Sequence, residues 1–241
     1  MVEGYLLVDE ALRSDAEVLE VYLADSGHAV GALAEACGVP VLATSERVIA
    51  ALSETTTPQG CVAVVRTPQA SLEVAAGADL VLLLAEVRDP GNAGTLIRSA
   101  AALGAGCVVV SSASVDVWSS KTVRASAGAV WRLPVVAEAP LDDTVAALRS
   151  FGFVLLGTDP RAAVHVDHED LTRRIAFVVG NESRGVGEEV RRLVDHDVSI
   201  PMSGLAESLN AGVAGSVLLF EAARQRREAA RLSLRPDEAP R

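Results

Sequence analysis

The run Leu80-Val81-Leu82-Leu83-Leu84 limits the possible folds of this 241-residue chain more than any other segment. Five consecutive apolar residues leave no polar face, which is typical of a strand covered on both faces, as in a parallel sheet. Short apolar runs alternate with amphipathic stretches along the rest of the chain. This alternation predicts an α/β protein built on a parallel sheet.

The chain divides into two blocks around residues 67–78, where Pro68 and Gly77 interrupt both patterns and indicate a linker. We expect a small domain over 1–66 and a larger one over 79–241. In the first, the pattern predicts helices at 5–14, 28–37 and 46–54 and strands at 18–24, 40–43 and 61–65. In the second, it predicts strands at 80–84, 107–111, 153–156, 175–179 and 197–200 and helices at 94–104, 142–150, 186–193 and 206–231.

The charge of the chain is distributed unevenly between these blocks. The sequence holds 32 acidic and 21 basic residues, a formal net charge of −11. This balance argues against nucleic-acid binding by bulk charge, because such binding depends on Lys and Arg displacing counterions. Residues 1–77 carry 11 acidic and 3 basic residues, a net of −8, whereas residues 78–241 carry 21 and 18, a net of −3. Any contact with RNA is therefore expected mainly in the second block.

The residue inventory excludes several classes of protein. Lys121 is the only lysine, and neither a P-loop glycine nor a Ser-x-x-Lys pattern accompanies it. Cys37, Cys61 and Cys107 lie far apart in apolar stretches, which favours core packing in a reducing compartment over disulfides or zinc. No basic n-region opens the chain, and no apolar run reaches the ~18 residues of a membrane span. We expect a soluble, cytoplasmic protein without a metal.

Two loops that follow expected strands carry glycine and polar residues. The first is Asp89-Pro90-Gly91-Asn92-Ala93-Gly94, and Arg98 lies about one turn into the helix after it, where a guanidinium could reach a phosphate. An Asn cap with a solvent-facing Arg98 explains the same residues. The second is Gly180-Asn181-Glu182, at a strand end where open α/β sheets bind ligands. A glycine turn before a capped helix explains this loop equally well.

A third loop ends a strand at Ile200-Pro201-Met202 and leads into a helix rich in small residues. Its Ser208 and Asn210 are expected to be buried among Ala, Gly and Val, and buried polar groups need hydrogen-bonding partners. A bound polar ligand or nearby backbone would supply those partners. The three loops together therefore form the candidate site.

In order, spacing and residue type, the three loops closely resemble the motifs of the SpoU–TrmH branch of the SPOUT methyltransferases. The resemblance covers about residues 79–225 and includes the stretches 121–126 and 128–135. Residues 2–26 are more weakly similar to the family's small N-terminal RNA-recognition domain. The resemblance implies a parallel-sheet SPOUT catalytic domain with a C-terminal trefoil knot, an exception to the rule against knotted chains. A small α/β/α substrate-recognition domain would precede it.

The resemblance also implies ligands and contact residues. S-adenosylmethionine is the implied cofactor, structured RNA the substrate, and a second copy of the chain the partner in a homodimer. The residues that match the family's catalytic positions are Asn92, Arg98, Glu182, Ser208 and Asn210. Those that match its cofactor-binding positions are Gly157, Thr158, Gly180, Asn181, Glu182, Ile200, Pro201, Met202, Ser208 and Leu209. The basic residues placed to contact RNA are Arg98, Lys121, Arg124 and Arg132.

The typical reaction of the family is methyl transfer to a ribose 2′-hydroxyl, and we expect 23S rRNA as the substrate. A tRNA 2′-O-methyltransferase and a catalytically silent RNA-binding or regulatory paralog are the alternatives. The protein must align the 2′-oxygen with the methyl group and help remove its proton. Because an arginine stays protonated, we expect Arg98 to bind the adjacent phosphate and stabilise the developing alkoxide. Proton removal is left to water or a neighbouring group.

Two further groups of residues are open to more than one interpretation. His165 and His168 lie three positions apart beside acidic residues, but this is not His-Glu-x-x-His spacing, so a metal site is not expected. Trp118 and Trp131 flank the basic residues between them. That pattern fits either RNA contact or ordinary packing of both indoles.

Overall fold

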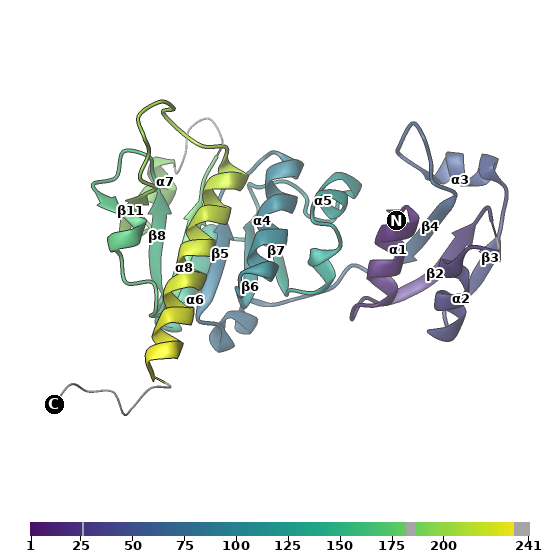
Figure 1. Ribbon diagram of the computed structural model, residues 1–241, viewed down its shortest axis with the longest axis horizontal. Coiled ribbons are helices and arrows are strands. Elements are labelled where there is room, and N and C mark those ends of the chain that lie inside the picture. Colours follow the sequence, from purple (N-terminus) through teal and green to yellow (C-terminus); the bar gives the residue numbers. More distant parts are fainter. Residues whose placement is uncertain (26, 182–186, 234–241) are drawn as a thin grey trace.

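The apolar runs of the sequence assemble into two β-sheets. The computed structural model describes residues 1–25, 27–181 and 187–233. A four-stranded sheet belongs to the N-terminal lobe and a seven-stranded sheet to the larger lobe (Figure 1). Every strand expected from the sequence is present, and the α/β prediction is confirmed.

The small sheet has the spatial order β1-β4-β2-β3. Its strands are β1 (Val2–Glu3), β4 (Cys61–Val65), β2 (Val18–Leu23) and β3 (Val41–Ala43). Strand β4 runs antiparallel to both β1 and β2, whereas β2 and β3 are parallel. The helices of this lobe are α1 (Tyr5–Leu12), α2 (Ala29–Ala36) and α3 (Glu46–Leu52). Helix α3 begins where the Ser45 hydroxyl accepts the Val48 N–H at 3.4 Å.

The large sheet is parallel throughout and places the most apolar strand near its centre. In spatial order its strands are β7 (Val135–Ala139), β6 (Cys107–Ser111), β5 (Leu80–Leu84), β10 (Ile175–Val179), β8 (Val154–Thr158), β11 (His196–Ser199) and β9 (Val164–His165). Leu82 pairs with Phe177 on one side and Val108 on the other. All five residues of β5 are buried, because helices cover both faces of the sheet.

Alternate residues of β5 contact different helices. Leu82 shares a core with Leu96 and Leu218, from α4 (Pro90–Ala102) and α8 (Ala211–Ser233), and α5 (Ser120–Ala125) packs beside α4 on that face. Leu83 shares the opposite core with Leu148 of α6 (Leu141–Ser150). The short helices are η1 (Leu72–Gly77), η2 (Ala129–Trp131), η3 (Val166–His168) and α7 (Glu188–Arg191). Among the helices described, none is long and apolar enough to cross a membrane.

Two helices, α4 and α8, begin four or more residues from their expected starts. The helix expected at 94–104 starts at Pro90, because Asp89 Oδ1 accepts the Asn92 N–H at 2.7 Å and Pro90 fits the first helical position. The capping residue is therefore Asp89, and Arg98 lies about two turns into α4 rather than one. The helix expected at 206–231 starts at Ala211, and residues 201–210 are exposed. The expected linker also contains a helical turn, η1.

The N-terminal lobe is docked on the larger lobe around α1 and η2. Val8 belongs to the same continuous core cluster as Trp131. At the rim of this contact, the Arg132 guanidinium donates from Nη2 and Nε to one carboxylate oxygen of Glu10, at 2.6 and 3.1 Å. The two lobes therefore share apolar packing as well as an ion pair.

Arg174, just before β10, ties the end of the linker to the large sheet. Its guanidinium donates to the carbonyl oxygens of Ala76 and Ala78, each at 2.6 Å, and also to that of Phe151. The guanidinium lies 4.6 Å from the ring centroid of Phe153. One half-buried side chain thus satisfies carbonyl groups from two separate segments.

We expect Arg174→Lys to lower the free energy of unfolding by about 2 kcal/mol, because an ammonium cannot reproduce the planar set of donors. Denaturant unfolding followed by circular dichroism measures the change. Arg173→Lys is the matched control: the Arg173 side chain is 45% exposed, and lysine keeps the charge that faces Glu169, so we expect a change below about 0.5 kcal/mol. Equal stability of the two variants would contradict the role given to Arg174.

Candidate active site

A pocket of about 390 Å³ lies at the carboxyl ends of β8, β10 and β11. Parallel strands place these ends at one edge of the sheet, where α/β proteins bind ligands. Two of the three loops singled out in the sequence contribute to it, together with residues 158–161 after β8. The remaining loop, 89–94, lies beside the pocket, since Asn181 Nδ2 donates to the carbonyl of Glu86 at 3.3 Å just before that loop.

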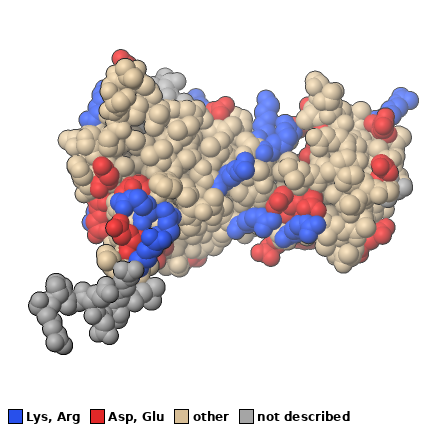
Figure 2. All heavy atoms as spheres, viewed as in Figure 1, with Lys and Arg blue, Asp and Glu red and all other residues tan. Residues whose placement is uncertain are grey.

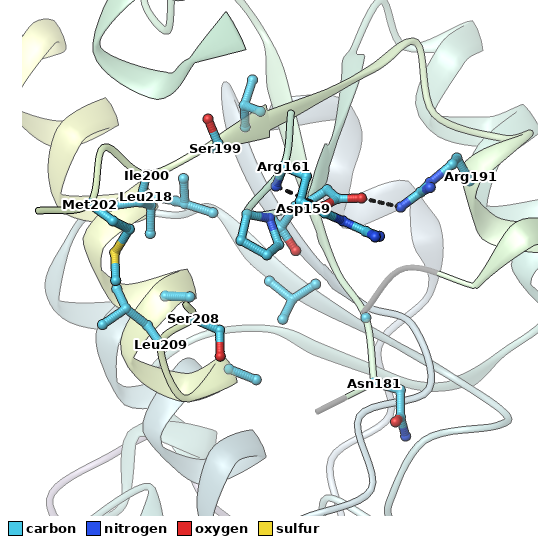
Figure 3. A pocket seen from close by; sticks show the side chains of 17 residues that line it. Asp159, Arg161, Asn181, Arg191, Ser199, Ile200, Met202, Ser208, Leu209 and Leu218 are labelled. Atoms are coloured by element: carbon cyan, nitrogen blue, oxygen red, sulfur yellow. Dashed lines mark hydrogen bonds and ion pairs between the residues drawn. The ribbon is translucent and has the colours of Figure 1, made fainter. Parts of the chain in front are cut away.

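One side of the pocket is apolar. Figure 3 shows Ile200, Met202, Leu209 and Leu218 grouped there, from the β11 loop and helix α8. Met202 and Leu209 are 36% and 37% exposed, unlike the fully covered core residues of the sheet. This side therefore offers accessible apolar surface to a ligand.

The opposite side of the pocket is charged and is built around Asp159. This carboxylate is only 9% exposed, accepts the backbone N–H of Arg161 at 2.9 Å, and binds the Arg191 guanidinium (Figure 3). Burial favours the protonated acid, but the hydrogen bonds from Arg161 and the charges of Arg161 and Arg191 outweigh it and lower the pKa of Asp159. Asp159 therefore contributes a fixed negative charge to the pocket wall.

Arg191 joins the two strand ends that flank the pocket. Besides Asp159 after β8, it contacts Asp197 in β11, with Nε 3.3 Å from Oδ2. Asp197 is paired with Gly157 in the sheet, and a side chain on Gly157 would collide with Asp197 Oδ1. Gly157 therefore makes room for the carboxylate that Arg191 binds. Sequence reasoning missed Asp159, Arg161 and Arg191, because the ion pair that organises them joins Asp159 to Arg191, 32 residues further along the chain.

We expect Arg191→Gln to weaken S-adenosylmethionine binding about tenfold, because the two carboxylates then repel each other without a bridging cation. Isothermal titration calorimetry measures the affinity. Asp159→Asn should weaken binding by a similar factor. The double variant should lose less binding free energy than the sum of the two single losses, since the two residues act as a pair. Arg192→Gln is the control, because Arg192 is the next residue in the chain and its side chain is 79% exposed. Affinities equal to that of the control would contradict this role.

The structure brings most of the cofactor-binding candidates together. Those that line the pocket are Thr158, Gly180, Asn181, Ile200, Met202, Ser208 and Leu209. Pro201 and Gly157 are not among the lining residues, and Gly157 acts through Asp197 instead. Glu182, a candidate for both catalysis and cofactor binding, lies outside the described residues. The roles of all these residues stay predictions.

Two catalytic candidates, Asn92 and Asn210, meet at the start of α8. Their side-chain oxygens each lie 3.2 Å from the position that a side chain on Gly212 would occupy. Asn92 is buried in the first turn of α4, whereas Asn210 Oδ1 accepts the Val213 N–H at 3.2 Å. The expectation that Ser208 and Asn210 are buried is wrong: both are exposed, because α8 begins only after them.

The basic candidates differ in their surroundings. Arg98 and Lys121 are exposed and make no hydrogen bond or ion pair in the described part of the chain. Arg124 is partly buried, and its Nη1 has no hydrogen-bond partner among the described residues. Arg132, by contrast, is bound to Glu10. Figure 2 shows Lys and Arg side chains gathered near the waist between the two lobes, with acidic side chains spread over the N-terminal lobe.

Two histidines form side-chain contacts within the fold. His165 Nδ1 lies 2.9 Å from the Ser199 hydroxyl, and His196 Nε2 lies 2.9 Å from a carboxylate oxygen of Glu169. Within residues 1–25, 27–181 and 187–233, no group of three or more His, Cys, Asp or Glu side chains could hold a metal ion.

Comparison with known families and proteins gives matches along most of the chain. The model of the SpoU rRNA Methylase family matches residues 79–220, and that of RNA 2′-O ribose methyltransferase substrate binding matches residues 1–71. A Bacillus subtilis relative, 23S rRNA (guanosine(2553)-2′-O)-methyltransferase RlmP, is 34% identical over 91% of this chain and 86% of its own length. A 23S rRNA (uridine(2479)-2′-O)-methyltransferase of Streptomyces viridochromogenes is 40% identical over 70% of this chain and 61% of its own.

Solved structures show the same arrangement. The SpoU methyltransferase AviRb from Streptomyces viridochromogenes, in complex with the cofactor AdoMet, superposes with a TM-score of 0.83 at 32% identity, covering 93% of this chain and 89% of its own. An AdoMet-bound rRNA methyltransferase from Sinorhizobium meliloti gives 0.80 at 30% identity, with 92% and 85% covered.

The parallel sheet, the pocket at its carboxyl edge and the similarity to AdoMet-bound methyltransferase structures place this chain in the class of α/β methyltransferases. It belongs to the SpoU rRNA Methylase family, whose model covers more than half of its length.

Proposed function

We propose that this protein transfers a methyl group from S-adenosylmethionine to a ribose 2′-hydroxyl of 23S rRNA, in the cytoplasm. The observation that carries the proposal is the pocket at the carboxyl ends of β8, β10 and β11. It occurs in a chain whose relatives are named as 23S rRNA 2′-O-methyltransferases and whose structural neighbours are solved with AdoMet.

The pocket suits S-adenosylmethionine in size and polarity. Its volume of about 390 Å³ lies within the roughly 300–1,000 Å³ of ordinary ligand sites. The adenine ring is flat and largely apolar, which matches the side formed by Ile200, Met202 and Leu209. The amino-acid end carries an ammonium and a carboxylate, which are complementary to Asp159 and Arg161. When bound, this cofactor supplies an activated methyl group.

Arg98 is the residue we assign to the RNA side of the reaction. It is exposed on α4, in the helix that also carries Asn92 toward the start of α8. The guanidinium stays protonated, so it binds the neighbouring phosphate and stabilises negative charge developing on the 2′-oxygen. Water accepts the proton of the hydroxyl. We assign Asn92, Ser208 and Asn210 to orienting the ribose and the reacting ends of both substrates.

We further propose a homodimer with a C-terminal knot. Helix α8 presents Val213, Val217 and Phe220 at i, i+4 and i+7, and these side chains are 47%, 36% and 53% exposed. Such a stripe on one helix face is typical of a protein interface. The knot is supported by the position of β10 between β5 and β8, with α8 returning to pack on β10 and α4.

A substitution that places a charged side chain in this apolar stripe tests the proposed dimer. We expect Phe220→Glu to shift the sedimentation equilibrium from dimer to monomer, because an interface cannot bury an unpaired carboxylate at low cost. Leu232→Glu, at an exposed position near the end of α8, is the control. A wild-type protein that sediments as a monomer would contradict the proposal.

The activity is tested in two steps with the full chain. Calorimetry with S-adenosylmethionine measures cofactor binding, and tritiated S-adenosylmethionine then reports methyl transfer to unmodified 23S rRNA and to unmodified tRNA. We expect label in 23S rRNA, and resistance of the labelled nucleotide to alkaline cleavage shows a 2′-O-methyl group. Label in tRNA alone would favour the tRNA alternative. Cofactor binding without any labelled RNA would favour a silent RNA-binding paralog.

A further inference from the structure

A second cavity, of about 640 Å³, lies at the edge of the large sheet toward the N-terminal lobe. Its walls are β7, the end of β6, the loop 112–118 and residues 67–70 of the connection between the lobes. The cavity therefore lies where residues 67–70 join the two lobes.

The cavity wall also holds the loop that leads to the catalytic helix α4. Ser111 and Ser114 both line the cavity. The Ser111 hydroxyl accepts the Glu86 N–H at 3.3 Å, and the Ser114 hydroxyl accepts the Val87 N–H at 3.2 Å. In the sheet, β5 lies between the strands of this cavity and those of the cofactor pocket. The two cavities therefore flank the loop between β5 and α4, the helix that carries Asn92.

The chemistry of the lining points to a neutral, planar ligand with hydrogen-bond donors. Trp118 lines the cavity and is only partly buried, whereas Trp131 is buried in the core. No Lys or Arg is among the lining residues, so the cavity does not suit a phosphate. Asp116 and Glu138 contribute carboxylates, and the exposed Glu138 side chain makes no hydrogen bond within the described ranges.

We propose that this cavity binds an unstacked nucleobase of the RNA, flanking the methylated nucleotide, with Trp118 as its stacking surface. The inference rests on the proposed function. Aromatic side chains that stack bases beside basic residues are the usual means of holding single-stranded RNA. The exposed Lys121 follows Trp118 by three residues and supplies a cation for the adjoining phosphate. The carboxylate of Glu138 accepts amino or imino hydrogens, which favours guanine.

The test uses the full-length protein, unmodified 23S rRNA transcribed in vitro and tritiated S-adenosylmethionine. We expect Trp118→Ala to raise the KM for RNA about tenfold, because one stacked base is lost. The turnover number and the cofactor affinity stay within twofold, because the cavity is separate from the cofactor pocket. Trp118→Phe should restore most of the RNA affinity, whereas Trp118→Leu, which keeps apolar packing against the core but offers no ring, should not restore it. Glu73→Gln, an exposed carboxylate outside the cavity, is the control for Glu138→Gln.

Base selectivity identifies what the cavity holds. Once the methylated nucleotide is mapped, each base within three positions of it is replaced in turn. We expect one position at which the wild type prefers guanine about tenfold, and Glu138→Gln should reduce that preference below threefold. Wild-type KM in Trp118→Ala, or unchanged selectivity in Glu138→Gln, would overturn the inference. Absence of methyl transfer by the wild-type protein to any RNA would instead contradict the proposed function.

Discussion

Replacing Arg98 by lysine should lower the turnover number for methyl transfer by about a hundredfold. Lysine keeps the positive charge but loses the planar fork that binds a phosphate and a second oxygen together. Arg98 is exposed on α4 and does not line the cofactor pocket, so the affinity for S-adenosylmethionine should not change. Single-turnover assays with saturating RNA and cofactor measure the rate, and calorimetry measures cofactor binding.

The choice of lysine separates two roles for this arginine. If Arg98 contributes charge alone, Arg98→Lys retains most of the activity, and the guanidinium geometry proposed for it is wrong. Arg47→Lys is the matched control, because Arg47 is exposed on α3 in the other lobe and should leave turnover unchanged. Parallel activity profiles against pH for the variant and the wild type would show that residue 98 is not the proton acceptor.

The second large effect is expected at the crossing of α4 and α5. Gly94→Ala should lower the free energy of unfolding by about 3 kcal/mol, because the new methyl group would clash with Ala125 and approach the backbone nitrogen of Ser126 to 2.8 Å. In an isolated helix the same change would stabilise by about 1 kcal/mol. The sign of the change in the free energy of unfolding therefore shows whether α4 and α5 cross as closely as in the structure. Urea unfolding followed by circular dichroism measures it.

Gly77→Ala provides the control for this substitution. No atom outside its own neighbours lies within 4 Å of the added methyl group, so stability should stay within about 0.5 kcal/mol of the wild type. A stabilised Gly94→Ala variant would mean that α5 does not pack against α4 at this residue. Because Asn92 and Arg98 share α4 with Gly94, a destabilised variant should also lose activity at lower temperatures than the wild type.

Five of the seven strands of the large sheet could be predicted from the pattern of apolar residues, whereas β7 and β9 were not predicted. Leu80–Leu84 has no polar position, and a strand covered on both faces requires that pattern. The first residues of the helices are harder to predict from sequence than the strands. Asp89 and Asn92 are both capping residue types, and only the structure shows that Asp89 accepts the first free N–H. The start of α8 depends on Asn210 in the same way.

Site residues could be predicted where a local motif carries them and not where tertiary contacts create them. Ile200, Met202 and Leu209 lie in one loop, and all three line the pocket. Asp159 and Arg191 lie on opposite sides of β10 in the chain, so their ion pair follows from sheet order and not from spacing. Arg132 illustrates the converse. Its position beside other basic residues predicts RNA contact, which stays a prediction, and only the fold shows that its guanidinium also binds Glu10 of the other lobe.

The shared core between the lobes has a consequence for how proteins of this design acquire new targets. Val8 and Trp131 belong to one core, and Glu10 binds Arg132 at its rim, so the recognition lobe is fixed to the catalytic lobe by more than the connecting chain. Recombination that replaces this lobe must also replace the surface on which it rests. Point substitutions on its outer face carry no such requirement. Divergence of specificity should therefore proceed within an inherited pair of lobes rather than by exchange of one of them.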